Sequence, residues 1–134
     1  MRLLATLLLL GTSVCANAEE SLVYLYNLLD RQPYHDTWNA LLAGEKRVPT
    51  WLARYNESRR GTGTGVKTLE FDNQQYQASS VCKARECSES IFYVIFTPDS
   101  SRAFGRLVVN ARTETFYGHP DDSMKDALRS LSRK

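Results

Sequence analysis

The chain has few of the residues from which metal centres and disulfide frameworks are built. Its 134 residues include three cysteines and two histidines. These residues do not fall at the spacings of a usual metal-ligand set, so we expect neither a metal site nor a cofactor. An excess of one charge is also missing, because 17 Lys and Arg oppose 15 Asp and Glu, for a net charge of +2. With no basic block in the sequence, we expect no nucleic-acid partner.

A run of apolar residues long enough to span a membrane is absent too. The nearly unbroken apolar stretch Leu3–Leu10 falls well short of the ~20 residues that a membrane anchor needs. It follows Arg2 and is followed by Ala16-Asn17-Ala18. A basic start, a short apolar core and small residues at an A-x-A site are the layout of a secretory signal peptide. We therefore expect residues 1–18 to be removed after Ala18 and the protein to be exported to the periplasm.

The mature chain is expected to be a single domain, residues 19–134. Removing 18 of the 134 residues leaves 116, with 16 basic and 15 acidic side chains and a net charge of +1. A chain of this size can enclose one hydrophobic core. Val14 is bulkier than the residue that usually precedes a lipidated cysteine, so Cys15 is not expected to carry a lipid or hold the mature protein at a membrane.

Hydrophobic periodicity places helices first and strands second. Leu22, Leu25, Tyr26 and Leu29 recur at helical spacing, and Ile91–Phe96 is continuously apolar like a buried central strand. We expect helices over residues 22–29, 33–44 and 48–55, strands over 66–72, 75–81, 91–96, 102–110 and 115–117, and a last helix from 120. A hairpin turn is expected at Asn73-Gln74. This order indicates an α+β fold, a five-stranded antiparallel sheet with N-terminal helices and a C-terminal helix packed on it.

The aromatic residues of the helical half are expected to be mostly core, because they fall at helical spacing. They are Tyr24, Tyr26, Tyr34, Trp38, Trp51 and Tyr55.

Three short motifs that look like chemistry have simpler interpretations. The glycine-rich segment 61–65 lacks the glycine that a P-loop needs where Val66 stands, and strands follow it where a P-loop needs a helix. We expect a flexible loop there. His35-Asp36 has no nucleophile beside it, and His119 precedes Pro120 at a helix entry. No catalytic set is visible, so we expect a protein that is not an enzyme.

The segment Cys82-Lys83-Ala84-Arg85-Glu86-Cys87 is different, because it lies between two expected strands and three of its four enclosed residues are charged. Two cysteines in an oxidising compartment usually form one disulfide. A ring this small adds only ~2 kcal/mol to stability in the chain-entropy model. It does hold the loop in one shape, which lowers the entropy lost on binding a partner. A bridge that merely secures a strand connection is an equally open alternative.

The sequence resembles the inhibitor of vertebrate lysozyme (Ivy) family of periplasmic proteins. The resemblance covers nearly all of the mature chain and rests on segments that occur in family order. They are Tyr24–Leu29, Trp38 with Leu41 and Leu42, Gly44–Leu52, Cys82–Cys87, Phe96–Asp99, Ala103–Gly105 and Phe116–Pro120. The resemblance implies a five-stranded antiparallel sheet with helices packed on it, and a homodimer.

The resemblance also implies that the loop Cys82–Cys87 is the partner-binding site. In the family this loop has the pattern C-K-P-H-D-C and enters the active-site cleft of a C-type lysozyme, where its histidine hydrogen-bonds the catalytic carboxylates. Cys82, Lys83 and Cys87 match that pattern, whereas Ala84, Arg85 and Glu86 replace proline, histidine and aspartate. Arg85 is the decisive departure, because a guanidinium is permanently charged and bulkier than an imidazole.

Two functions therefore follow as hypotheses. In the first, the protein is a C-type lysozyme inhibitor whose activity is weakened or altered by Arg85. In the second, it is a non-inhibitory paralogue that binds another periplasmic partner, such as an endogenous cell-wall lytic enzyme.

Overall fold

The computed structural model describes residues 23–133. The expected signal peptide, residues 1–18, and the first expected helical residue, Leu22, lie outside this range. Within it, no helix is long and apolar enough to cross a membrane.

Within residues 23–133, four helices precede a run of six strands, and one helix follows them. The helices are α1 (Leu25–Leu29), α2 (Tyr34–Ala43), α3 (Thr50–Ala53), α4 (Tyr55–Ser58) and α5 (Asp122–Ser130). The strands are β1 (Thr62–Gly63), β2 (Lys67–Phe71), β3 (Gln74–Cys82), β4 (Ser90–Phe96), β5 (Ala103–Val109) and β6 (Thr113–Tyr117). The five predicted strands are thus present as β2 to β6, which confirms the α+β fold.

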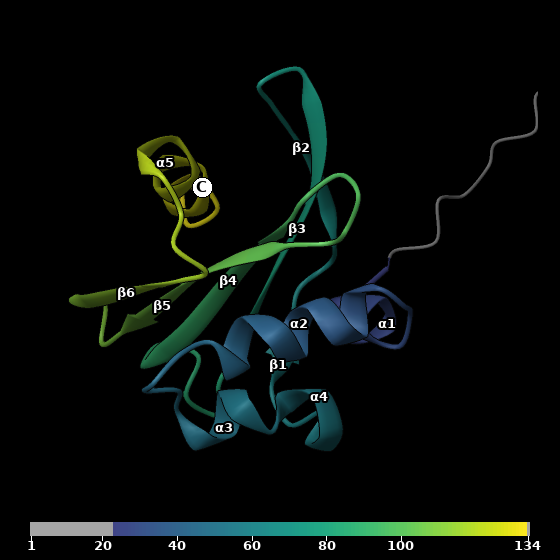
Figure 1. Cartoon of the computed structure of the whole chain (residues 1–134). Coiled ribbons are helices and arrows are strands. Elements are labelled where there is room, and N and C mark those ends of the chain that lie inside the picture. The colour runs from purple at the N-terminus through teal and green to yellow at the C-terminus, as the bar shows by residue number, and fades with distance from the viewer. Residues whose placement is uncertain (1–22, 134) are drawn as a thin grey trace, which may run out of the picture.

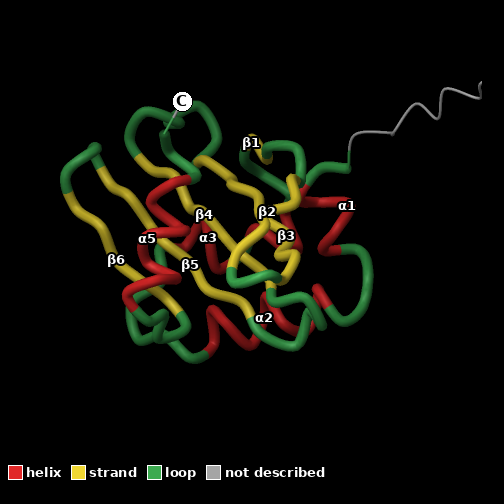
Figure 2. The backbone as a smooth tube through the Cα atoms, turned by 90° about the horizontal axis from the view of Figure 1, so that it is seen from above, coloured by secondary structure: helices red, strands yellow, loops and turns green. Residues whose placement is uncertain are grey.

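The sheet is antiparallel and has β4 near its middle. Its order is β1-β3-β4-β5-β6, and β2 also pairs with β3. The helices α1 to α4 lie on one side of the sheet and α5 on the other (Figure 1). Seen from above, α5 crosses β4 and β5, the two strands that it contacts most (Figure 2).

Successive side chains of a strand point to opposite faces of the sheet, so the core is divided between the face covered by α1 to α4 and the face covered by α5. Phe92, Val94 and Phe96 are fully buried against the helical side, whereas Ile95 between them is buried on the α5 side. The helical side receives its largest side chain from Trp38, which meets the Phe92 ring edge-on at 5.5 Å. Gly105 leaves room for that ring, because a Cβ at this position would lie 2.2 Å from a Phe92 ring carbon.

The α5 side is smaller and is bordered by charge. Asp121 caps α5 by accepting a hydrogen bond from the Met124 N–H at 2.8 Å. Glu114 on β6 forms ion pairs with Arg106 on β5 at 2.7 Å and with Arg129 on α5 at 2.6 Å. These pairs join α5 to two strands. The pKa of Glu114 is lowered to about 2, mainly by the hydrogen bond from the Arg129 guanidinium and to a smaller extent by Arg106.

Several local predictions were wrong. The expected helix 48–55 is two short helices that share Arg54 as cap. The hairpin turn lies one residue earlier, at Asp72-Asn73, where both residues have positive φ (49° and 59°). Asp and Asn tolerate that conformation better than Gln. In α1, Leu28 and not Tyr26 faces the core, and Tyr26 is 41% exposed.

The prediction for the remaining aromatic residues was mostly right. Trp38 and Tyr55 are fully buried, and Tyr34 and Trp51 are half-buried against the same core. Tyr24 is half-buried and stacks on the exposed Tyr26 instead.

Candidate functional site

The loop between β3 and β4 holds the predicted disulfide. Cys82 is the last residue of β3 and is buried, whereas Cys87 is exposed, and their Cα atoms lie 4.8 Å apart. This confirms the predicted pairing of Cys82 with Cys87.

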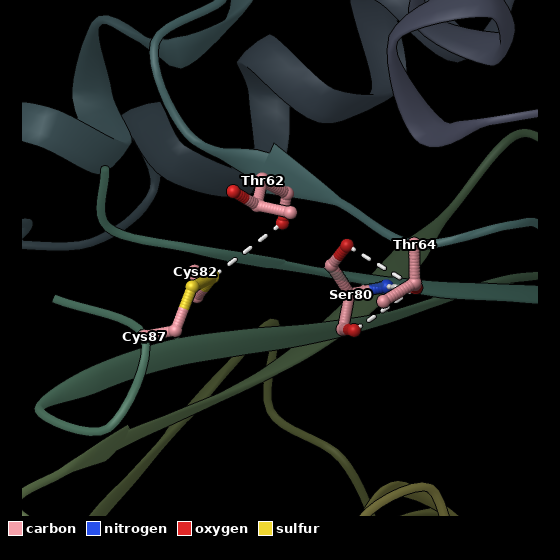
Figure 3. Close-up of a disulfide and its surroundings, with 5 residues drawn as sticks. All are labelled: Thr62, Thr64, Ser80, Cys82 and Cys87. Carbon is pink, nitrogen blue, oxygen red and sulfur yellow. Dashed lines mark hydrogen bonds between the residues drawn. A yellow bond between two sulfur atoms is a disulfide. The ribbon is translucent and has the colours of Figure 1, made fainter. Parts of the chain in front are cut away.

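The bridge begins where β1 lies beside β3 (Figure 3). The Thr62 carbonyl oxygen lies 3.6 Å from the Cys82 sulfur. Because a disulfide sulfur carries no proton, this approach is a packing contact and not a donated hydrogen bond. Two residues along, the Ser80 N–H donates to the Thr64 hydroxyl at 3.0 Å and the Thr64 N–H donates to the Ser80 carbonyl at 2.8 Å. These bonds fix the strand from which the loop starts.

The tip of the loop is a tight turn. The Glu86 N–H donates to the Lys83 carbonyl at 3.0 Å, which places Ala84 and Arg85 at the two central positions. Arg85 has a φ of 65°, in the left-handed region that costs an ordinary residue ~1 kcal/mol or more. Ala84 occupies the first central position, where turns favour proline, and its N–H donates to no backbone carbonyl within residues 23–133.

The base of the loop is held by the sheet. Lys83 N–H donates to the Ser90 carbonyl at 3.0 Å, and Ser90 N–H returns to the Glu86 carbonyl at 3.1 Å. Asn110, after β5, donates its N–H to the Glu89 carbonyl at 2.7 Å. The loop is therefore attached to β4 and to the β5–β6 turn as well as closed by its own bridge.

Charge within the loop is concentrated on one side chain. Lys83 and Glu86 form an ion pair across the turn. The hydrogen bond between them, reinforced by their opposite charges, raises the pKa of Lys83 and lowers the pKa of Glu86. Arg85 is exposed and forms no ion pair with any residue that the structure describes. The tip of the loop thus presents a single uncompensated cation.

A groove that sequence reasoning missed lies beside the loop. It has a volume of about 930 Å³ and is lined by residues of α3 and α4, including Trp51, Arg54 and Arg60 after α4, and by Lys83 and Ala84 of the loop. We call it the cationic groove. Its two walls are more than twenty residues apart in the chain, so no local motif could have revealed it.

The other motifs singled out in the sequence have structural roles. His35 is half-buried, and its Nδ1 lies 3.3 Å from the Leu29 carbonyl oxygen and 3.2 Å from the Asn56 amide nitrogen. It links α1, α2 and α4, while Asp36 is exposed and exchanges hydrogen bonds with Gln32. Within residues 23–133, no group of three or more His, Cys, Asp or Glu is placed to hold a metal ion.

The glycine-rich segment is more ordered than predicted, and this correction has a physical cause. Thr62 and Gly63 form β1 against Cys82 and Val81, so the expected flexible loop is partly an edge strand. Gly61 has a φ of 146°, and a Cβ there would lie 2.8 Å from the Cys82 carbonyl oxygen. The glycine is therefore required for close approach to β3, and not for binding phosphate. His119, with a φ of 55°, lies in the turn between β6 and α5.

Comparisons with known proteins agree with this architecture. A family model described as "Inhibitor of vertebrate lysozyme (Ivy)" matches residues 33–133. The chain is 32% identical to a Pseudomonas aeruginosa protein named "Inhibitor of vertebrate lysozyme", over 93% of this chain and 89% of that protein. It is 30% identical to an uncharacterized protein of Yersinia pestis, over 80% of this chain and 75% of that protein. The chain therefore belongs to the inhibitor of vertebrate lysozyme (Ivy) family.

Proposed function

We propose that the protein binds the active-site cleft of a C-type lysozyme with its loop Cys82–Cys87, and that Arg85 makes this inhibition weak or altered. The observation that carries the proposal is the position of Arg85, exposed and without an ion pair among the described residues, at the tip of a disulfide-closed loop in a member of this family.

The chemistry of the cleft explains why arginine differs from histidine. A lysozyme cleft holds two carboxyl groups, one protonated and one ionised. An imidazole can accept from the first and donate to the second, whereas a guanidinium can only donate. Arg85 must also lose its hydration to enter the cleft, which costs several kcal/mol unless the ion-pair geometry is excellent.

The backbone of the loop suits the family residues better than those present. Histidine is enriched several-fold among non-glycine residues with positive φ, the conformation that Arg85 adopts. Proline would preset φ where Ala84 lies and would forfeit no backbone hydrogen bond found in the structure. Arg85→His and Ala84→Pro are therefore expected to be compatible with the fold.

The test is lysozyme activity on cell walls at rising concentrations of the mature protein. We expect Arg85→His to lower the concentration for half-inhibition by about tenfold, a change of ~1.4 kcal/mol, and adding Ala84→Pro and Glu86→Asp to lower it further. Arg133→His, an equal change at an exposed site on the α5 side, is the matched control. The proposal would be contradicted if the unaltered protein inhibited tightly and Arg85→His weakened that inhibition. Arginine would then fit the cleft better than histidine.

A second candidate is a paralogue that binds another periplasmic protein, such as an endogenous cell-wall lytic enzyme, without inhibiting lysozyme. The cation at the loop tip and the cationic groove beside it favour this candidate, because a basic lysozyme would be repelled by them. Binding to the immobilised lytic enzyme, with no effect on lysozyme activity even for Arg85→His, would select it.

The setting of either function is also part of the proposal. The signal-peptide layout of residues 1–18 supports export to the periplasm and a mature domain over 19–134. Family resemblance supports a homodimer, which light scattering of the purified mature protein tests.

A further inference from the structure

We infer that the cationic groove is a second contact region, which binds an acidic segment of the same enzyme whose cleft the loop enters. This inference rests on the proposed function, since it assigns that enzyme an acidic surface beside its catalytic cleft.

The cationic groove lies directly beside the disulfide loop. Lys83 and Ala84 belong both to the disulfide loop and to the lining of the groove. The groove and the disulfide loop are therefore adjacent parts of one surface, which a single partner protein can cover.

Charge is the second argument. Arg54 and Arg60 are exposed and line the groove, and neither forms an ion pair within residues 23–133. No Asp or Glu is among the described residues that line it. Lys83 is already paired with Glu86, so the two arginines supply the unsatisfied charge.

The neighbouring Arg59 shows the contrast between a structural and a free arginine. Its guanidinium donates to the Asp30 carboxylate at 2.7 Å and to the Tyr26 carbonyl at 3.0 Å, and it thereby ties the end of α4 to α1. Arg60 is the next residue in the chain, and its backbone N–H donates to the Ser58 hydroxyl at 3.2 Å. The groove wall is therefore held in place while the Arg60 side chain has no partner among the described residues.

The chemistry of the lining selects an acidic peptide over a glycan. Trp51 is half-buried against the core and gives the groove an apolar surface, which suits the methylene stems of Glu side chains. Sugar hydroxyls need acceptors as well as donors, and the side-chain acceptors among the described lining residues are only the Thr50 and Ser58 hydroxyls, of which Ser58 already accepts the Arg60 N–H. Guanidinium groups bind carboxylates in pairs of parallel hydrogen bonds.

The experiment uses tryptophan fluorescence of the mature protein, because Trp38 is fully buried and Trp51 lines the groove. The probe is a hexaglutamate peptide at low ionic strength. We expect a saturable change that disappears in ~0.5 M salt and that a hexalysine peptide does not produce. The double variant Arg54→Gln/Arg60→Gln should weaken binding by about tenfold.

A charge-matched control is Arg102→Gln/Arg133→Gln, since both residues are exposed and lie away from the groove; it should bind like the unaltered protein. No response to hexaglutamate, an equal response to hexalysine, or an equal loss in the control variant would overturn the inference. Tighter binding of an anionic muramyl-peptide fragment than of hexaglutamate would also overturn it, in favour of a glycan site.

A second measurement separates this inference from the proposed function. Both double variants keep Arg85 and the disulfide, so the loop Cys82–Cys87 is unchanged in each. Against two C-type lysozymes of acidic and basic isoelectric point, Arg54→Gln/Arg60→Gln should weaken inhibition of the acidic enzyme only. Equal weakening for both enzymes would overturn the inference. Failure of every form of the protein to inhibit either enzyme would refute the proposed function, and the peptide titration would still decide the groove.

Discussion

Replacing Cys82 and Cys87 together by serine separates the contribution of the disulfide to folding from its contribution to binding. The bridge closes a ring whose ends have Cα atoms 4.8 Å apart and are five residues apart in sequence. In the chain-entropy model such a small ring stabilises the fold by about 2 kcal/mol. For a domain of this size that corresponds to a fall in Tm of roughly 8 °C.

The surroundings of the bridge indicate that the double variant will still fold. A serine hydroxyl at position 82 would stand near the Thr62 carbonyl, which lies 3.6 Å from the present sulfur, and can donate to it. Position 87 is exposed. The Glu86–Lys83 turn bond and the Lys83–Ser90 bond do not involve the sulfurs, so part of the loop geometry is retained.

Binding should fall clearly even though the variant stays folded. Without the bridge, the loop samples other conformations, and ordering even one residue again on binding costs ~1–2 kcal/mol. We therefore expect affinity for the partner to fall by at least about tenfold. Urea unfolding and inhibition assays on the same preparations measure the two effects. Reductant should make the unaltered protein behave like the double variant and leave the variant unchanged.

Two results would refute this reasoning. Unchanged affinity in the double variant would mean that the bridge only secures a strand connection. A loss of stability well above 2 kcal/mol would mean that the loop is part of the cooperative core, and that lost binding reports unfolding.

Three further predictions concern the scaffold and its maturation. The pKa of Glu114 is lowered to about 2 in the folded protein, so its ion pairs stabilise the fold fully above the unfolded pKa, and this stabilisation is lost as the pH falls through the folded pKa. Glu114→Gln should therefore lower the free energy of unfolding by ~1 kcal/mol near pH 7, allowing for solvent screening. In urea unfolding, the stability of the variant should approach that of the unaltered protein near pH 2. Gly105→Ala should destabilise by ~3 kcal/mol, because its Cβ would lie 2.2 Å from the Phe92 ring; a loss under 1 kcal/mol would show that the ring can move. The intact mass of the protein recovered from a periplasmic extract should correspond to removal of residues 1–18, and a lipid-modified Cys15 would contradict the expected maturation.

Much of the scaffold was predictable because its signals are local. The alternating or continuous apolar runs predicted β2 to β6, and Pro33 and Gly44 marked the ends of α2. The Cys82–Cys87 pairing was predicted from the cysteine count and the expected oxidising compartment. These features depend on backbone periodicity and turn chemistry within a few residues.

Features that depend on distant contacts were missed. The two-residue strand β1 exists only because β3 offers a pairing edge, and no periodicity is visible in two residues. Tyr26 fits the helical pattern of a core residue, yet it stacks on Tyr24 with ring centroids 5.5 Å apart and stays exposed. The cationic groove requires the α3–α4 segment to meet the disulfide loop, which is a property of the tertiary fold.

The central claim is that the Cys82–Cys87 loop occupies the catalytic cleft of its target, and competition tests it most directly. The measurement is the affinity of the mature protein, as the unaltered form and as Arg85→His, for a C-type lysozyme with and without a saturating chitin trisaccharide in the cleft. We predict that both forms bind the filled cleft more weakly than the empty one, and that Arg85→His binds the empty cleft more tightly than the unaltered protein does. Binding that is undiminished when the cleft is filled would contradict the account.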